Sequence, residues 1–173
     1  MQSITVRPEN SDDIRAIDVV HISAFGGEAE AHLVSTLRES ADYNRELSLV
    51  AELGGRIVGH ALLTRVPLRR HGEEKHLLAL GPMSVVPSQS HRGIGSKLIQ
   101  ASILLAREKG YGSIVVLGHP EYYKRFGFVL AKGLGVTCNL PAPEDALTVM
   151  EIVDGNLEGG GHIEYPEPFV ELY

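Results

Sequence analysis

The chain has 173 residues, of which 43% are hydrophobic and 22% are charged, and these are the proportions of an ordinary globular domain. It contains no stretch of about 20 apolar residues of the kind that spans a membrane, and its net charge of −6 excludes a broad nucleic-acid-binding surface. A single cysteine, Cys138, excludes an internal disulfide or a multi-cysteine metal site, and we interpret it as a buried, unreactive thiol.

The N-terminal residues predict a cytoplasmic location and a first strand. Residues 1–8 lack the basic region, apolar core and small-residue cleavage site of a secretory leader, so we expect a cytoplasmic protein. Apolar and polar residues alternate from Gln2 to Arg7, which predicts a strand that stops at Pro8.

Two helices are predicted next. Asn10 is a typical helix cap, and apolar residues then recur at helical spacing from Ile14 to Ala24. The pair Gly26-Gly27 ends this helix. A second helix is expected from about Glu28 to Ser40, because its apolar residues fall on one stripe.

A hairpin and a long strand follow these helices. Residues 48–53 and 56–66 are separated by Gly54-Gly55, the pattern of a hairpin with a two-residue turn. Residues 75–86 form a further strand that Gly81-Pro82 interrupts, and because proline cannot donate to a strand ladder we expect a bulge there.

The second half of the chain continues with alternating strands and helices. A helix over residues 93–109 lies between the strand before it and a strand over 113–117, which implies a parallel pair and a mixed α/β fold. Weaker signals predict a short helix over 121–126 and strands near 136–140 and 147–152. We expect the tail from Gly159 onward, with its prolines, to be irregular.

The segment from Met83 to Leu98 carries the clearest chemical signal. It reads as a strand, a short polar loop and a helix start, and the first turn of a helix attracts anions through its unpaired N–H groups. Gly93 and Gly95 would let the backbone approach phosphate oxygens closely, and Arg92 and Lys97 would add positive charge. The alternative is a turn that glycine loosens and that binds nothing.

Two other phosphate motifs do not fit this segment. A dinucleotide fingerprint needs a third glycine where Leu98 stands, and an acidic residue about 20 positions later, where the chain has the apolar run around Val116. The Walker pattern fails as well, because Gly-Lys-Ser/Thr does not occur. NAD and ATP are therefore not the expected ligands.

Two motifs together resemble the GNAT superfamily of N-acyltransferases. Val85-x-Pro87 followed by the run Arg92–Leu98 is similar to the acyl-CoA signature of that superfamily, and Tyr122–Phe128 resembles its Tyr-x-x-x-Gly-Phe element. The resemblance covers nearly the whole chain. It implies a single domain over 1–173, with a mixed, centrally splayed β-sheet and helices on both faces. The implied parts are an N-terminal half with acceptor-site helices (1–80), an acyl-CoA-binding core (81–130), and C-terminal strands and tail (131–173).

The resemblance also implies roles for individual residues. It places acetyl-CoA on two groups of residues: the backbone of Met83, Ser84 and Val85 for the pantetheine arm, and Arg92, Gly93, Ile94, Gly95, Ser96 and Lys97 for the pyrophosphate. One departure is Ser90, where the family usually has Gln or Arg. Tyr123 matches the tyrosine that protonates the departing CoA thiolate, and the alternative is that it only packs against CoA or the core.

The general base and the acceptor site are less well marked. The strand before the phosphate loop, residues 77–84, has no acidic residue. Either water carries the proton of the amine away, or a base comes from elsewhere in the chain, for which Glu28 and His119 are the candidates. In the family the loop that corresponds to Phe25 and Glu28 often lines the acceptor site, and His119 follows the next strand, so these three are also substrate-site candidates. The simpler interpretation favours Glu28 as a helix-start charge and His119 as a turn residue. The other histidines lack metal-ligand spacing, and we propose no metal.

These observations lead to one hypothesis and one rival. The hypothesis is an acetyl-CoA-dependent N-acetyltransferase that acts by direct attack of a primary amine, either a small molecule or a protein amine. The rival is a noncatalytic acyl-CoA-binding sensor or interaction module, which Ser90 and the missing strand carboxylate favour. We expect no nucleic-acid or membrane partner, and a monomer or homodimer.

Overall fold

The computed structural model describes residues 3–173, so the predicted strand start at Gln2 lies outside the described residues. These residues form a mixed α/β fold with a nine-stranded sheet and five α-helices, which confirms the predicted fold class. The chain packs into two units, described separately below: residues up to 64 with 81–102, and residues 65–80 with 103–173. The prediction of one domain over 1–173 stays a prediction.

Two strands and one helix contribute residues to both units. They are β3 (Arg56–Arg70), β4 (Glu73–Val85) and α3 (Ile94–Glu108). The first unit also contains β1 (Ile4–Pro8), α1 (Ile14–Phe25), α2 (Ala29–Arg38) and β2 (Ser48–Leu53). The second also contains β5 (Ser113–Leu117), α4 (Pro120–Lys124), β6 (Val129–Leu130), β7 (Val136–Cys138), β8 (Leu147–Glu151), β9 (Gly161–Ile163) and α5 (Glu167–Leu172).

In the first unit, β1, β2 and β3 form an antiparallel meander. Val6 pairs with Ala51 in β2, and Val50 pairs with His60 in β3. The β2–β3 turn uses Gly54 and Gly55 at φ of 59° and 79°, a conformation that suits glycine and matches the twist of a hairpin. The predicted hairpin is confirmed, although β3 extends to Arg70.

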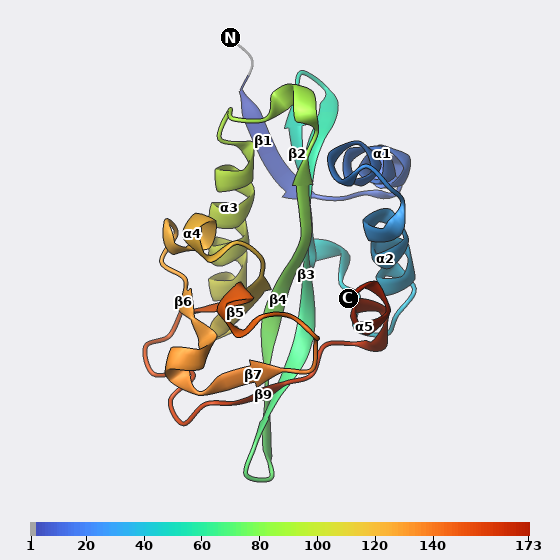
Figure 1. Ribbon diagram of the computed structural model, residues 1–173. Helices are drawn as coiled ribbons and strands as arrows, with labels where there is room; N and C mark the ends of the chain where they lie inside the picture. Colours follow the sequence, from blue (N-terminus) through green and yellow to red (C-terminus); the bar gives the residue numbers. More distant parts are fainter. Residues whose placement is uncertain (1–2) are drawn as a thin grey trace. The chain divides into compact units, whose positions relative to one another are not determined.

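Helices cover both faces of the strands in this unit. A Cβ atom at Gly59 would lie 3.1 Å from side-chain atoms of Ile94 and Leu98 in α3. The next residue, His60, points to the opposite face, because successive strand residues alternate, and there it contacts His21 of α1. Figure 1 shows α1 and α3 on opposite sides of these strands.

The local signals at the ends of α1 act as expected. The Asn10 side chain accepts a hydrogen bond from the Asp12 amide, and the Asp13 carboxylate accepts one from the Asn10 amide, so the two form a capping box. Gly26, at φ of 75°, ends the helix in the left-handed conformation, and its amide donates to the Ile22 carbonyl. The capping box belongs to the 3-10 turn Ser11–Asp13, which leads directly into α1, and Gly26 fixes where α1 ends.

The parallel pair that the sequence predicts is present in the second unit. Leu78, Ala79 and Leu80 of β4 pair with the run Ile114–Val116 of β5. Gly81 and Pro82 follow at once, with Gly81 at φ of 144° and a cis bond between the two residues. Met83–Val85 therefore lies in β4 beyond the last residue of that ladder.

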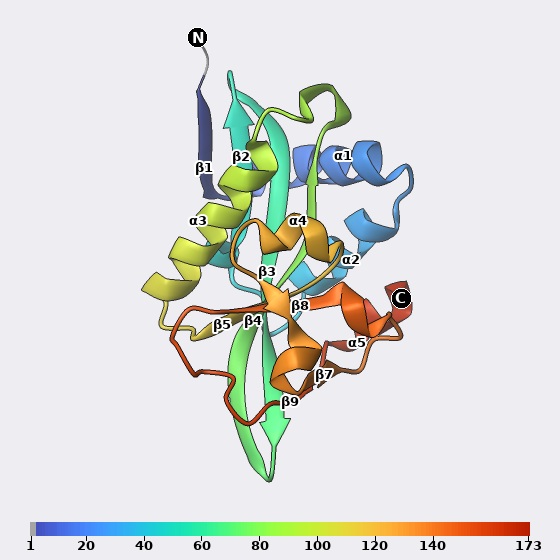
Figure 2. The ribbon, with the colours of Figure 1, turned by 60° about the vertical axis from the view of Figure 1, so that its left-hand side comes forward.

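The C-terminal tail is regular, which corrects the prediction. β9 pairs in parallel with β7 and antiparallel with residues 68–69 of β3 (Figure 2). The Gly159–Gly161 run permits this packing, since a Cβ at Gly161 would lie 2.9 Å from Leu68. The two prolines flank the start of α5, Pro166 as its N-cap and Pro168 in its first turn, where proline is tolerated.

The remaining strands of the second unit are antiparallel. β8 lies between β5 and β6, with Val149 paired to Val115 on one side and to Val129 on the other. The short strand β6 was not predicted, because two residues carry no periodicity. Across the described helices, none has the length and apolar character that membrane crossing requires.

Candidate functional site

The phosphate-loop segment lies entirely in the first unit and ends at the N-terminus of α3. The Lys97 amide donates to the Gly93 carbonyl at 3.1 Å, which is the first bond of the helical ladder. The amides of Ile94, Gly95 and Ser96 therefore precede that first bond, as the leading N–H groups of any α-helix do. Because α3 has 15 residues, its aligned peptide dipoles add positive potential at this end.

Gly93 is shaped for close approach of a ligand. It has φ of 77°, which side-chain-bearing residues rarely adopt, and no atom lies within 4 Å of the position that a Cβ would take. Arg92 and Lys97, one on each side, are exposed. A pyrophosphate could be bound here by the unpaired amides of the first helical turn and by the two exposed cations, and the free space at Gly93 would let it approach the backbone.

The loop before Gly93 holds its shape by local bonds. Residues 87–89 form one 3-10 turn, and the Ser90 hydroxyl donates to the Pro87 carbonyl at 2.9 Å. His91 then takes a left-handed conformation at φ of 64°. Ser90, which stands where the family usually has Gln or Arg, is therefore exposed and bonded to its own loop.

Ser84 has a buried side chain within the predicted pantetheine-binding strand. Met83 and Val85 are half-buried, whereas Ser84 is 7% exposed. The Ser84 Oγ lies 2.8 Å from Nδ1 of His21. This contact opens a chain of hydrogen bonds that no sequence motif indicated.

The chain runs through buried polar side chains from α1, β2, β3 and β4 and from the residue after β1. His21 Nε2 lies 2.7 Å from His60 Nδ1, and His60 Nε2 lies 2.8 Å from the Ser48 Oγ. The Ser48 hydroxyl donates to the Glu9 carboxylate, directly after β1. His21, His60 and Ser48 are fully buried, and Glu9 is 2% exposed. We call Glu9, Ser48, His60, His21 and Ser84 the buried polar chain.

Glu9 is held at the inner end of this chain by arginines. The Arg38 guanidinium donates to both carboxylate oxygens of Glu9, each at 3.2 Å. Arg45 donates to the Glu9 carbonyl at 2.7 Å. The bidentate ion pair with Arg38, whose side chain is 15% exposed, stabilises the ionised form of Glu9 in the resting protein.

The ionised Glu9 sets the direction of each bond. Since the single Ser48 proton goes to Glu9, the Ser48 oxygen must accept from Nε2–H of His60. A neutral His60 then has a bare Nδ1, which accepts from Nε2–H of His21. By the same logic the bare Nδ1 of His21 accepts from the Ser84 hydroxyl.

Burial keeps both imidazoles neutral. It lowers the pKa of His21 to about 4, with a further contribution from the charge of Arg38. It also lowers the pKa of His60 well below the ordinary value, with His21 and Arg38 acting in the same direction. Both rings are therefore uncharged at neutral pH.

Phe25 covers His21 on the solvent side of this unit. The two rings stack with centroids 6.0 Å apart and planes 17° apart, and Phe25 is 46% exposed. Glu28 is an exposed residue at the N-cap of α2, and its carbonyl accepts the His32 amide at 2.8 Å. The interpretation of Glu28 as a helix-start charge agrees with this position.

Tyr123 lies in the second unit, on α4. Its ring packs edge-on against Tyr122 and Phe128, with centroids 5.2 and 5.7 Å away. Burial, with smaller effects of Tyr122 and Tyr173, raises the pKa of Tyr123 to about 12. The phenol therefore keeps its proton throughout the neutral range.

Residues just before α4 make room for Tyr123. A Cβ at Gly118 would lie 2.9 Å from a Tyr123 ring carbon, so glycine is required for this packing. His119 is exposed at the N-cap of α4, and its carbonyl accepts the Tyr122 amide at 3.1 Å. This is the position of a turn residue.

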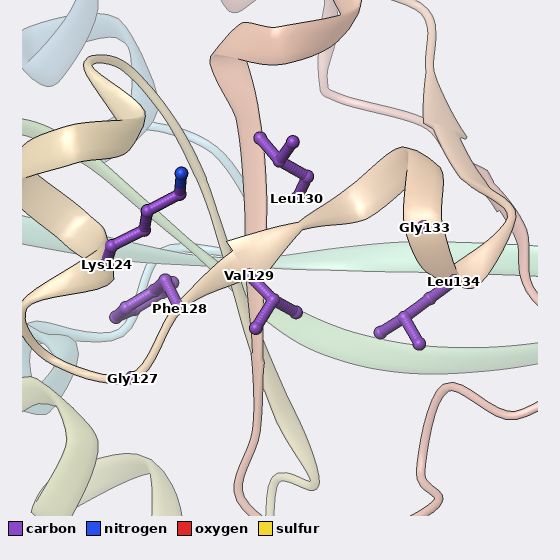
Figure 3. Close-up of a pocket in the computed structure, with 7 residues that line it drawn as sticks. All are labelled: Lys124, Gly127, Phe128, Val129, Leu130, Gly133 and Leu134. Carbon is purple, nitrogen blue, oxygen red and sulfur yellow. The ribbon is translucent and has the colours of Figure 1, made fainter.

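The second unit also contains the single cysteine and a surface pocket. Burial raises the pKa of the half-buried Cys138 thiol, which agrees with an unreactive role. A mostly apolar pocket of about 630 Å³ lies between α4 and the turn after β6. Figure 3 shows the side chains that line it. It is lined by Lys124, Gly127, Phe128, Val129, Leu130, Gly133 and Leu134. None of the site residues predicted from the sequence lines it.

Sequence reasoning missed most of the buried polar chain. The sequence places His21 inside the first predicted helix and His60 inside the predicted strand over residues 56–66, and no motif marks either residue. The available signal was a polar residue at a core position in two separate elements, since a buried imidazole needs a partner. Their pairing became visible only when the strands were in register.

The chain is similar to a known family over most of its length. The sequence model of the acetyltransferase (GNAT) family matches residues 15–128. The uncharacterized N-acetyltransferase YhbS of Escherichia coli K12 is 33% identical over 166 residues, which cover 95% of this chain and 97% of that protein. The uncharacterized N-acetyltransferase YjhQ of the same strain is 33% identical over 163 residues, with coverage of 92% and 88%.

Solved structures agree with this similarity. The crystal structure of Escherichia coli YhbS in complex with CoA has a TM-score of 0.90 and 32% identity, and covers 98% of this chain and 93% of that chain. A GNAT family acetyltransferase from Brucella melitensis in complex with acetyl-CoA has a TM-score of 0.79 and 29% identity, with coverage of 98% and 99%.

The two buried histidines predict a specific pH dependence of stability. Between pH 6.5 and 4 the two histidines bind protons in the unfolded chain but not in the folded one. The free energy of unfolding therefore keeps its full value above pH 6.5 and falls as the pH drops below it. We expect His21 alone to remove about 3 kcal/mol from the free energy of unfolding across this range. Urea unfolding at several pH values measures it.

A matched pair of variants isolates this effect. His21→Gln should flatten the dependence, because it removes one of the two buried titrating groups. His32→Gln removes an exposed imidazole from α2 and should leave it as in the wild type. A wild-type stability that stays constant from pH 6.5 to 4.5 would show that the imidazoles are not buried in neutral form.

Proposed function

Because this chain belongs to the acetyltransferase (GNAT) family, we propose that it transfers an acetyl group from acetyl-CoA to a primary amine by direct attack of the amine on the thioester. The observation that carries the proposal is the start of α3. There Gly93, at positive φ and with free space around it, precedes the unpaired amides of the first helical turn. A relative that shares this fold is solved in complex with CoA.

The first unit supplies the residues that would hold acetyl-CoA. Amides of residues 92–97 would bind the pyrophosphate, with Arg92 and Lys97 at its edge. Backbone groups of Met83, Ser84 and Val85 would pair with the amides of the pantetheine arm, as an added strand does. That stretch follows the last residue of the β4–β5 ladder, which supports this role.

The reaction requires two proton movements. The amine must lose a proton to attack, and the sulfur of the leaving CoA must gain one. We propose Tyr123 for the second step. Its pKa of about 12 keeps the phenol protonated at neutral pH, and the same shift makes it a weaker acid than an exposed tyrosine. Its assignment as the donor rests on the Tyr-x-x-x-Gly-Phe motif.

The acceptor is proposed only as a primary amine. Phe25, exposed on α1, and Glu28, exposed at the start of α2, would offer an apolar surface and a negative charge to a cationic amine. His119 is a weaker candidate, since it is exposed at the helix start of α4. These three assignments are part of the proposal.

A noncatalytic acyl-CoA-binding module is the second candidate. Ser90 favours it, because its hydroxyl is bonded to the loop itself and adds no cation for the phosphates. Binding of CoA without turnover would be its signature.

The function is tested by incubating the full-length protein with acetyl-CoA and separate pools of polyamines, aminoglycosides, amino acids and peptides with free N-termini. We expect free CoA thiol to appear together with a product heavier by one acetyl group in at least one pool. Tight CoA binding with no acetylated product from any pool would favour the noncatalytic module.

The Tyr123→Phe variant tests the proton donor. Removing the hydroxyl leaves the aromatic packing, so CoA should bind as in the wild type, while kcat should fall about 10²-fold. Calorimetry measures the first quantity, and the rate of thiol release the second.

Tyr122→Phe is the matched control, because Tyr122 is the preceding residue and its ring packs against the ring of Tyr123. It should keep most of the turnover. If Tyr123→Phe retained wild-type kcat under conditions where chemistry limits the rate, another group would have to protonate the sulfur.

A further inference from the structure

The buried polar chain is built in a way that packing alone does not require. Burying a hydrogen-bonded polar group gains little over an apolar one, so five such groups in the core of one unit call for a reason. Each member is bonded to the next, and every hydrogen points from Ser84 towards Glu9. A line of hydroxyls and imidazoles with this order can pass a proton along its length.

All five members of the chain are buried, and the two ends are slightly more exposed than the middle. Ser84 is 7% exposed, and the adjoining His21 ring is covered by the half-exposed Phe25. At the other end, the side chain of Arg38, which holds Glu9, is 15% exposed. His60 and Ser48, between these ends, are fully buried.

We propose that the buried polar chain is the proton acceptor of the reaction, with Ser84 as the point of entry and the Glu9 carboxylate as the terminus. This inference rests on the proposed function, because Ser84 lies in the stretch proposed to hold the pantetheine arm. It supplies the base that strand β4 does not carry as a carboxylate.

The proton transfers balance at every member. An amine N–H bond breaks as a Ser84 O–H bond forms, and the former Ser84 proton moves to Nδ1 of His21. The Nε2 proton of His21 passes to Nδ1 of His60, and the Nε2 proton of His60 passes to the Ser48 oxygen. The former Ser48 proton then neutralises Glu9. The amine has lost one proton and Glu9 has gained one.

The Glu9 carboxylate at the end of the buried polar chain explains how two weakly basic histidines can pass on a proton. Burial disfavours a charged imidazole at either position, so neither ring would hold the proton for long. Glu9 is negative, and passing the proton to it leaves both imidazoles neutral again. Without Ser48 the path would stop at His60, whose ring would have to carry the charge.

Ser48→Ala is therefore the decisive variant, because the Ser48 hydroxyl is bonded to Glu9 and His60, and Ser48 is not among the residues proposed to bind CoA or the acceptor. We expect kcat to fall by about 10- to 100-fold, while KM for acetyl-CoA stays within about twofold. Ser48→Thr, which restores a hydroxyl, should recover most of kcat. The probes are acetyl-CoA and the amine with the highest turnover in the pools above.

Ser102→Ala is the matched control. Ser102 is another fully buried serine of the first unit, but its hydroxyl donates only to the Leu98 carbonyl within α3, at 2.7 Å. Its loss should leave kcat unchanged. Ser84→Ala, at the less buried end, gives a second break in the chain if Ser48→Ala does not fold.

Solvent deuterium separates a relay from a structural role. In the wild type we expect kcat to fall in D2O with a curved dependence on deuterium fraction, because several protons move together. In Ser48→Ala the dependence should become less curved, a change that altered packing would not produce.

The outcomes distinguish this inference from the proposed function. No acetylated product from the wild-type protein refutes both. A wild-type enzyme whose kcat is retained in Ser48→Ala and Ser84→Ala refutes the relay alone. A rise in KM for acetyl-CoA with unchanged kcat also refutes it, and assigns the chain to shaping the cofactor site.

Discussion

The ionised Glu9 is the constraint on which the first unit depends. Its pairing with Arg38 fixes the Ser48 proton, and that proton fixes the tautomers of His60 and His21 in turn. The same bonds connect the end of β1, the start of β2, the middle of β3, and α1. A slip of one residue in β3 would turn His60 to the opposite face of the sheet and break the chain. Polar bonding therefore specifies strand register here, in addition to apolar packing.

Two adjacent residues of β3 serve the two faces of the unit. Gly59 leaves room for Ile94 and Leu98 in the first turns of α3, whose N-terminus carries the proposed phosphate site. His60 points the other way and joins the buried polar chain. Ser84 of β4 connects the two functions, since its backbone is proposed to hold the pantetheine arm and its hydroxyl contacts His21. The proposed cofactor site and the proposed proton path thus use neighbouring positions of the same strands.

Local signals made most of the fold predictable. The Asn10 cap, Gly26 and the Gly54-Gly55 turn each act over a few residues, so the sequence alone indicates them. The tail was predicted wrongly because Gly161 is needed for a close approach to Leu68, a contact that is distant in sequence. The buried polar chain escaped prediction for the same reason: it joins residues from position 9 to position 84. The phosphate-loop residues could be proposed from the sequence because they are contiguous along the chain.

The tautomers of His21 and His60 test this account most directly, and long-range ¹H–¹⁵N correlation spectra of the full-length protein at pH 7 report them. The donor order predicts that both rings are neutral and carry their proton on Nε2, with Nδ1 bare. His21→Gln and His60→Gln assign the signals. A ring protonated on both nitrogens, or a proton on Nδ1 of either residue, would contradict the direction of the chain and with it the proposed path to Glu9.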